Sequence, residues 1–250
     1  MALDFSASTT VVNHGSGATI DNLDAQTWLF WLNATAINSA NKRFMWKNSG
    51  SSGAQILQGP IGGTQGRMRY ARSRATTGSD ATSPNDTLVV GTWQGIAITD
   101  QDGVSPKIYL RTLATALAEL GSYAVQTTGS GAPADESAQT LYIGGRNAAG
   151  VEGDVIIAYW AVFNSILTLA DMASWFKRPR AIIGAATAQC FSRFNNTTSI
   201  VDWSGNGNTG TPENSPTLVA NPPIDEGELT WGETAGGILT PTPGLMALSA

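Results

Sequence analysis

The stretch Thr-Trp-Leu-Phe-Trp-Leu at residues 27–32 carries a large apolar side chain at every position after the first. Successive side chains of a β-strand point to opposite faces, so this stretch predicts a strand that is covered on both sides. A second apolar run, Val155 to Phe163, is the longest in the chain and has the length of a strand. It is too short to cross a membrane, which takes about 20 apolar residues.

Shorter candidate strands alternate with turn-forming segments over the first two thirds of the chain. The strands are expected at 43–47, 54–58, 67–70, 88–99, 107–111 and 140–143. The turns are expected at 49–53, 76–86, 100–105 and 127–138, where Gly, Ser, Asn, Asp and Pro gather. Short strands at this spacing predict an all-β sandwich or jelly roll. Its core is expected to include Trp28, Trp31, Trp93 and Trp160.

One short helix is expected after the run that ends at Phe163. Thr168 is a candidate N-cap, and Asp171 stands at the capping-box position. Pro179 ends the helix. The apolar side of the helix is expected to be Met172, Trp175 and Phe176. Residues 113–120 also contain helix-forming side chains, but their apolar spacing follows the helical period poorly, which leaves a second helix there open.

The composition excludes several classes of protein. Eight Trp, seven Phe and five Tyr exclude disorder over most of the chain. The net charge of −5 comes without a concentrated basic face, so a nucleic-acid partner is not expected. Arg67 and Arg69 are two residues apart and are expected on the solvent face of a strand. The single cysteine, Cys190, excludes an internal disulfide and a Cys-based zinc site.

The first five residues lack a basic region followed by an apolar run. We therefore expect synthesis in the cytoplasm without a signal peptide, and no association with a membrane.

Six segments, in order along residues 2–178, carry a family resemblance. They are 3–5, 27–31, 91–99, 108–110, 141–144 and 153–168. Together they resemble the laminin-G-like, concanavalin A-like jelly-roll domains, although Arg111-Thr112 replaces the Asp-Gly turn that usually follows the fourth segment. The resemblance implies an antiparallel β-sandwich jelly roll with one short helix over residues 1–178, and it does not identify the function.

Residues 179–224 are expected to form an additional β and loop segment packed on the jelly roll. They contain the run Asp-Trp-Ser-Gly-Asn-Gly-Asn at 202–208, whose composition predicts a tight turn. The run resembles a segment found beside such jelly rolls in bacteriophage and bacterial surface proteins. We interpret it as a structural turn, and the alternative is a calcium or sugar loop that uses Asp202 and Asn206.

Residues 225–250 are rich in Gly, Pro and Thr and contain no basic residue. Apolar residues stand singly between turn residues, which predicts an extended C-terminal arm that docks on a partner subunit. The expected anchors are Trp231, Ile238, Leu239, Leu245 and Met246.

Catalytic chemistry is not expected. A glycosidase needs two carboxylates at a set separation. The nearest match, Glu152-Gly153-Asp154, lacks the third acid of related glucanases, so these acids are expected to flank the start of a strand. The only histidine, His14, lies in a turn-like stretch and is expected in a surface loop. Cys190 is expected to be a buried, small apolar residue.

Two functions remain. The first is a virion structural protein, as a bacteriophage capsid decoration or a head or tail appendage that docks on subunits such as the major capsid protein and self-associates. The second is a carbohydrate-binding module or adhesin on the same fold, which recognises host-surface glycans. The residues expected to contact a glycan are Trp46, Trp203 and Asn206, of which the two tryptophans are expected to be free of the core.

Overall fold

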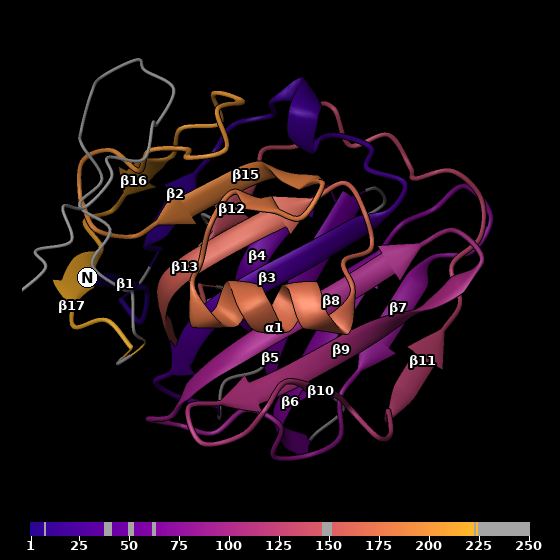
Figure 1. The fold of residues 1–250 in the computed structure, drawn as a ribbon, viewed down its shortest axis with the longest axis horizontal. Helices are drawn as coiled ribbons and strands as arrows, with labels where there is room; N and C mark the ends of the chain where they lie inside the picture. Colours follow the sequence, from indigo (N-terminus) through magenta and orange to yellow (C-terminus); the bar gives the residue numbers. More distant parts are fainter. Residues whose placement is uncertain are drawn as a thin grey trace, which may run out of the picture.

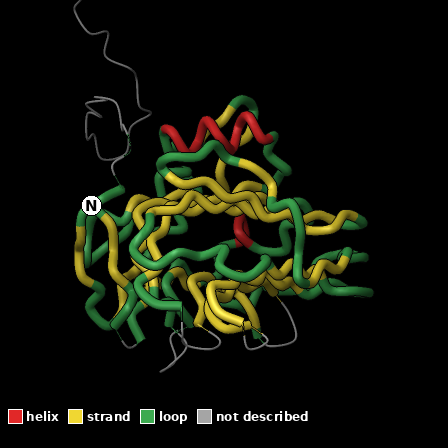
Figure 2. Tube along the Cα trace, turned by 90° about the horizontal axis from the view of Figure 1, so that it is seen from below, coloured by secondary structure: helices red, strands yellow, loops and turns green. Residues whose placement is uncertain are grey.

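The protein folds into two antiparallel β-sheets that pack face to face, with one helix on the outer side of the first sheet (Figures 1 and 2). This computed structural model describes residues 1–224 apart from 8, 38–41, 50–52, 62–63, 147–151 and 223. The predicted all-β sandwich with one short helix is confirmed.

The first sheet, sheet A, has nine strands. Along its path the strands are β10 (Ala118–Glu119), β9 (Val104–Thr112), β8 (Trp93–Gln101), β3 (Gln26–Ala34), β13 (Val155–Phe163), β1 (Ala2–Asp4) and β17 (Thr217–Val219). Two further strands join it through β13, namely β15 (Ala186–Arg193), which pairs with β13, and β14 (Ile182–Ile183), which pairs with β15. The expected strands 27–32 and 155–163 are β3 and β13, at the middle of this sheet.

The second sheet, sheet B, has eight strands. In order they are β11 (Val125–Thr127), β7 (Ser79–Thr82), β6 (Thr64–Arg72), β5 (Gly53–Ile61), β4 (Lys42–Asn48), β12 (Tyr142–Ile143), β2 (Val11–Asn13) and β16 (Thr211–Glu213). A single 3-10 turn, η1 (Ala18–Ile20), follows β2.

Strand β3 has apolar side chains on both faces because each face meets a different core. Trp28, Phe30 and Leu32 belong to the cluster between the two sheets. Leu29 and Trp31 belong to a second cluster, which lies between sheet A and the helix. Sheet A is therefore covered on both sides, as the apolar pattern of residues 27–32 predicted.

Helix α1 (Leu169–Lys177) covers the outer face of sheet A (Figure 2). The Thr168 hydroxyl accepts a hydrogen bond from the Asp171 N–H at 3.1 Å, so the predicted N-cap is confirmed. The helix ends before Pro179. Its buried residues are the predicted Met172, Trp175 and Phe176. None of the described helices is long and apolar enough to cross a membrane.

Residues 113–120, where the sequence allowed a second helix, do not form one. The Thr112 hydroxyl accepts hydrogen bonds from the N–H groups of Ala114 and Thr115, at 3.2 and 3.1 Å. The next residues, Ala118–Glu119, pair with the edge strand β9. A hydroxyl that binds nearby backbone N–H groups competes with helix formation, and an open sheet edge offers the remaining groups a partner.

Two strand boundaries also differ from the expectation. The segment 76–86, expected to be a turn, contains β7, which pairs with β6 and β11. Ser and Asp have low strand propensity, so here the neighbouring strands decide the conformation. The strand expected at 88–99 begins only at Trp93, after a turn in which Gly91 adopts φ +74°. Trp93 is only partly buried, so the prediction that it is a core residue is wrong.

Residues 179–224 add strands to both sheets. In sheet A, β15 pairs with β13 and β17 pairs with β1. In sheet B, β16 pairs with β2. The segment is thus integrated into the sandwich through strand pairing, while the division of the chain at residues 178 and 224 stays a prediction.

Candidate functional site

A row of side chains crosses the outer face of sheet B, with one residue from each of the six strands β12, β4, β5, β6, β7 and β11. The register pairs Tyr142 with Trp46, Trp46 with Gln55, Gln55 with Ala71, Ala71 with Asp80, and Asp80 with Thr127. Residues that lie directly opposite one another in an antiparallel pair project to the same side of the sheet. All six side chains therefore share one face.

The neighbouring row shows which face this is. It pairs Ile143 with Met45, Met45 with Ile56, Ile56 with Tyr70, and Tyr70 with Ala81, all of which belong to the core between the sheets. Because side chains alternate along each strand, the row that contains Gln55 and Asp80 points away from the core.

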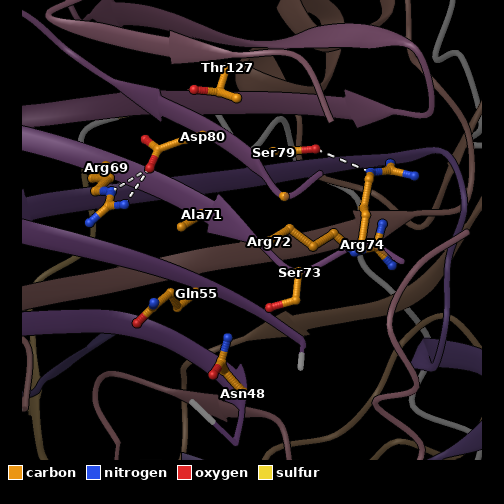
Figure 3. A pocket seen from close by; sticks show the side chains of 11 residues that line it. Asn48, Gln55, Arg69, Ala71, Arg72, Ser73, Arg74, Ser79, Asp80 and Thr127 are labelled. Carbon is orange, nitrogen blue, oxygen red and sulfur yellow. Dashed lines mark hydrogen bonds and ion pairs between the residues drawn. The ribbon is translucent and has the colours of Figure 1, made fainter. Parts of the chain in front are cut away.

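The part of this row from β5 to β11 lines a groove of about 440 Å³ (Figure 3). Its lining residues are Asn48, Gln55, Arg69, Ala71, Arg72, Ser73, Arg74, Gly78, Ser79, Asp80 and Thr127. This volume lies within the range of about 300–1,000 Å³ that is common for small-molecule sites. The lining is polar and offers both hydrogen-bond donors and acceptors.

Contacts between strands hold the polar side chains of the groove in place. The Arg69 guanidinium and the Asp80 carboxylate form an ion pair, in which Nε donates to Oδ2 at 2.9 Å (Figure 3). Arg43 Nε donates to Gln55 Oε1 at 3.2 Å, which orients the Gln55 amide on the next strand. Donors and acceptors of the groove are thus positioned before any partner arrives.

Below the groove, charged side chains form a buried network between the sheets. Arg72 Nη2 lies 3.2 Å from Glu136 Oε1, and Arg72 Nη1 lies 3.6 Å from Asp100 Oδ2. The Asp100 carboxylate also accepts hydrogen bonds from Arg74 Nη2, at 3.0 Å, and from the Tyr70 hydroxyl, at 3.1 Å. Burial raises the pKa of Glu136, and burial together with the Asp100 charge raises that of Tyr70 well above its usual value.

Trp46, expected to be exposed, is only 8% exposed, so that expectation is wrong. Two guanidinium groups lie over its ring: Arg43 Cζ is 4.8 Å from the ring centroid and Arg146 Cζ is 4.7 Å from it. The ring face attracts cations, and the long arginine side chains cover the indole. A contact between Trp46 and a glycan stays a prediction.

The other two predicted glycan contacts lie elsewhere. Trp203 is partly buried against the cluster between sheet A and α1, which is the opposite side of the sandwich from Trp46. Asn206 is exposed, and its Nδ2 donates to the carbonyl groups of Ala188 and Gln189 on β15, both at 3.1 Å. The structure therefore does not bring the three residues into one site.

The loop 202–208 is organised by one carboxylate. Asp202 Oδ1 accepts the N–H groups of Phe191 and Ser204 at 3.1 and 2.9 Å, and Oδ2 accepts that of Asn208 at 2.9 Å. A carboxylate that binds three backbone N–H groups supports the interpretation as a structural turn. Within the described part of the chain, no three His, Cys, Asp or Glu side chains gather as metal ligands would.

His14 is 3% exposed, so the expectation of a surface-loop histidine is wrong. Its Nδ1 lies 2.8 Å from the Asn208 carbonyl oxygen, and its ring packs edge-on against Trp160. Burial lowers the pKa of His14 to about 4. Cys190 is fully buried, as predicted, and burial raises the pKa of its thiol well above the usual value.

Glu152 and Asp154, the acids nearest to a glycosidase pattern, face a lysine. Lys42 Nζ lies 3.4 Å from Glu152 Oε1 and 3.6 Å from Asp154 Oδ1, at the start of β13. Among the described residues that line the groove, Asp80 supplies the one carboxylate. Hydrolysis of a glycosidic bond needs two carboxylates, so this lining does not supply the usual pair.

The groove residues on β7 and β11 were not identified from the sequence. Arg67 and Arg69 were expected on a solvent face, and both are partly exposed there. Their alternation was the signal that this face of sheet B is polar. The predicted arm residues Trp231, Ile238, Leu239, Leu245 and Met246 lie outside the described residues.

No protein-family model matches the chain, and no curated protein is similar to it in sequence. Among solved structures, a candidate carbohydrate-binding protein from Bacteroides ovatus is similar, with a TM-score of 0.63 and 14% identity, over 90% of this chain and 61% of that one. The receptor-binding domain of botulinum neurotoxin type G has a TM-score of 0.42 and 15% identity, over 62% of this chain and 38% of that one.

The chain spans less than two thirds of the length of both structures. At 14% identity, the similarity to the Bacteroides ovatus protein shows a shared β-sandwich fold.

Proposed function

We propose that this protein binds carbohydrate, and that the saccharide lies on the outer face of sheet B. The single observation that carries the proposal is the row of partly exposed polar side chains across β5, β6, β7 and β11, represented by Gln55, Asp80 and Thr127. These side chains stand on paired strands, which hold them more precisely than loops would.

The chemistry of the groove suits sugar hydroxyl groups, each of which donates one hydrogen bond and accepts two. Asp80 supplies acceptor oxygens, Arg69 supplies donors, and the Gln55 amide and the Thr127 hydroxyl supply both. A groove of about 440 Å³ on a sheet face has room for a short saccharide. The shared fold of the Bacteroides ovatus protein, itself described as a candidate carbohydrate-binding protein, agrees with this proposal.

A glycan array probed with the purified full-length chain tests the proposal, followed by calorimetry with each saccharide that binds. Gln55→Ala should weaken the affinity about three- to tenfold, because one or two hydrogen bonds are lost. The matched control is Gln189→Ala, a partly exposed glutamine on β15 of the other sheet, which should bind like the wild type.

Two results would contradict the proposal. If no saccharide on the array binds, the function is wrong. If saccharides bind but Gln55→Ala and Gln189→Ala behave alike, the function stands and the site lies on another surface.

The virion role stays a prediction. It depends on the arm at residues 225–250, and its test is whether the protein copurifies with virus particles and with a capsid subunit.

A further inference from the structure

The outer face of sheet B is richer in positive charge than the protein as a whole, which carries a net charge of −5. Among the described residues, this face and its edge carry four arginines, at positions 43, 67, 69 and 146. The described acids on the same face are Asp80, which pairs with Arg69, and Glu213, which accepts a hydrogen bond from Asn13 on the neighbouring strand. Among the described side chains that project outward from the strands of this face, arginines therefore outnumber acids by three to two, and Arg146 adds a fourth positive charge over Trp46.

Two of these arginines gather at one ring. The guanidinium groups of Arg43 and Arg146 both lie within 5 Å of the Trp46 ring centroid, at 4.8 and 4.7 Å. They are therefore less than about 10 Å apart, which is close enough for two positive charges to repel each other at ordinary ionic strength. The pKa of Arg43 is lowered by burial and, next, by the charge of Arg146.

The arginine pair adjoins the groove. Arg43 donates a hydrogen bond to Gln55, which lines the groove. In the sheet register, Arg43 lies opposite Leu57, and Leu57 lies opposite Arg69. Neighbouring strands are about 4.8 Å apart, so the backbones of Arg43 and Arg69 are about 10 Å apart. A saccharide in the groove that extends toward β12 would reach the guanidinium groups that lie over the Trp46 ring.

We infer that the saccharide bound on this face is acidic, and that Arg43 and Arg146 bind its carboxylate or sulfate group; the inference rests on the proposed function. The planar guanidinium group offers several N–H donors in a fork that matches carboxylate and sulfate oxygens. An anion bound at these two guanidinium groups offsets their mutual repulsion. A neutral sugar leaves that repulsion in place, so the pair selects against it.

The experiment compares saccharides that share a backbone and differ in charge. Binding of the full-length chain is measured by calorimetry with hexagalacturonate and its methyl ester, and with a heparin hexasaccharide and its desulfated form. We expect at least one acidic member to bind at least tenfold more tightly than its neutral or less charged partner, with affinity that falls as salt rises. The first pair shows whether the protein recognises a carboxylate, and the second pair shows whether it recognises a sulfate.

Variants connect the preference to the two arginines. Arg146→Gln changes an exposed side chain and should reduce the preference for the acidic partner at least fivefold. Arg43→Gln should also reduce the preference. Arg43→Lys keeps the charge but loses the planar fork, and should reduce the preference less than Arg43→Gln does. The control, Lys177→Gln, removes one positive charge from the exposed end of α1, beyond sheet A, and should leave the preference unchanged.

The outcomes separate this inference from the proposed function. Equal affinity for acidic and neutral partners, or a preference that survives in Arg146→Gln and in Arg43→Gln, overturns the inference and leaves carbohydrate binding intact. If no saccharide binds on these probes or on the array, both fail. A single-stranded oligonucleotide that binds as tightly and with the same dependence on Arg146 would overturn the assignment of a saccharide.

Discussion

Replacing Arg72 by Met should destabilise the protein strongly, whereas the same replacement at Arg69 should change its stability little. Both arginines lie on β6, three residues apart, and so on opposite faces of sheet B. The Arg72 side chain is 0% exposed, and that of Arg69 is 39% exposed. The two variants make the same chemical change, so they differ only in surroundings.

The magnitude for Arg72 follows from its partners. Removing one member of a buried ion pair costs about 3–5 kcal/mol, because the remaining charge stays in a medium of low dielectric constant. Arg72→Met removes the 3.2 Å contact with Glu136 and the 3.6 Å contact with Asp100. Arg74 and Tyr70 still bind Asp100, so we expect a loss near the lower end, about 3 kcal/mol.

For the exposed pair of Arg69 and Asp80 the expected loss is about 0.2–1 kcal/mol, since solvent screens both charges. Urea denaturation followed by tryptophan fluorescence measures both free energies of unfolding. Equal losses, or a loss below about 1 kcal/mol for Arg72→Met, would refute the buried network below the groove.

Three further predictions concern the core and the loop. His14 is the only histidine, and its pKa falls from 6.5 when unfolded to about 4 when folded, so the unfolded state binds the extra proton between these values. Stability should therefore fall by about 3 kcal/mol as the pH drops from 6.5 to 4. The difference between wild type and His14→Gln in denaturation curves at several pH values isolates the contribution of His14 to this pH dependence. Trp31→Ala should lower the free energy of unfolding by about 3–5 kcal/mol and Trp93→Ala distinctly less, because Trp31 is fully buried and Trp93 is not. Equal losses in urea denaturation would contradict this difference in burial. Asp202→Ala should lower stability by about 2–3 kcal/mol, because three backbone N–H groups lose their acceptor, whereas Asn206→Ala should cost less than about 1 kcal/mol. Thermal unfolding of both variants, with and without calcium, measures these losses and shows whether the loop responds to the ion.

The central strands and the helix could be predicted because their signals are local. Apolar side chains at successive positions of residues 27–32 require cover on both faces, and the sandwich with its outer helix provides it. The cap at Thr168 and the stop at Pro179 act within a few residues of the helix that they bound. Neither depends on a distant segment.

Expectations that needed distant contacts were wrong. His14 lies in a turn-like stretch of sequence but is buried by Trp160 and by the loop at 202–208. Trp46 stands in an outward-facing row and is nevertheless covered, because Arg146 arrives from the end of another strand. Local composition does not record which segments cover a side chain.

By itself the sequence determined the all-β sandwich, its most apolar strands, its single helix and the polar alternation of Arg67 and Arg69. Each of these follows from the spacing of side chains along one element. Only the tertiary structure decided that Gln55, Asp80 and Thr127 share one groove, and that two arginines meet at Trp46. The register between strands sets which side chains lie opposite one another, and a shift of one residue would turn a whole row toward the core.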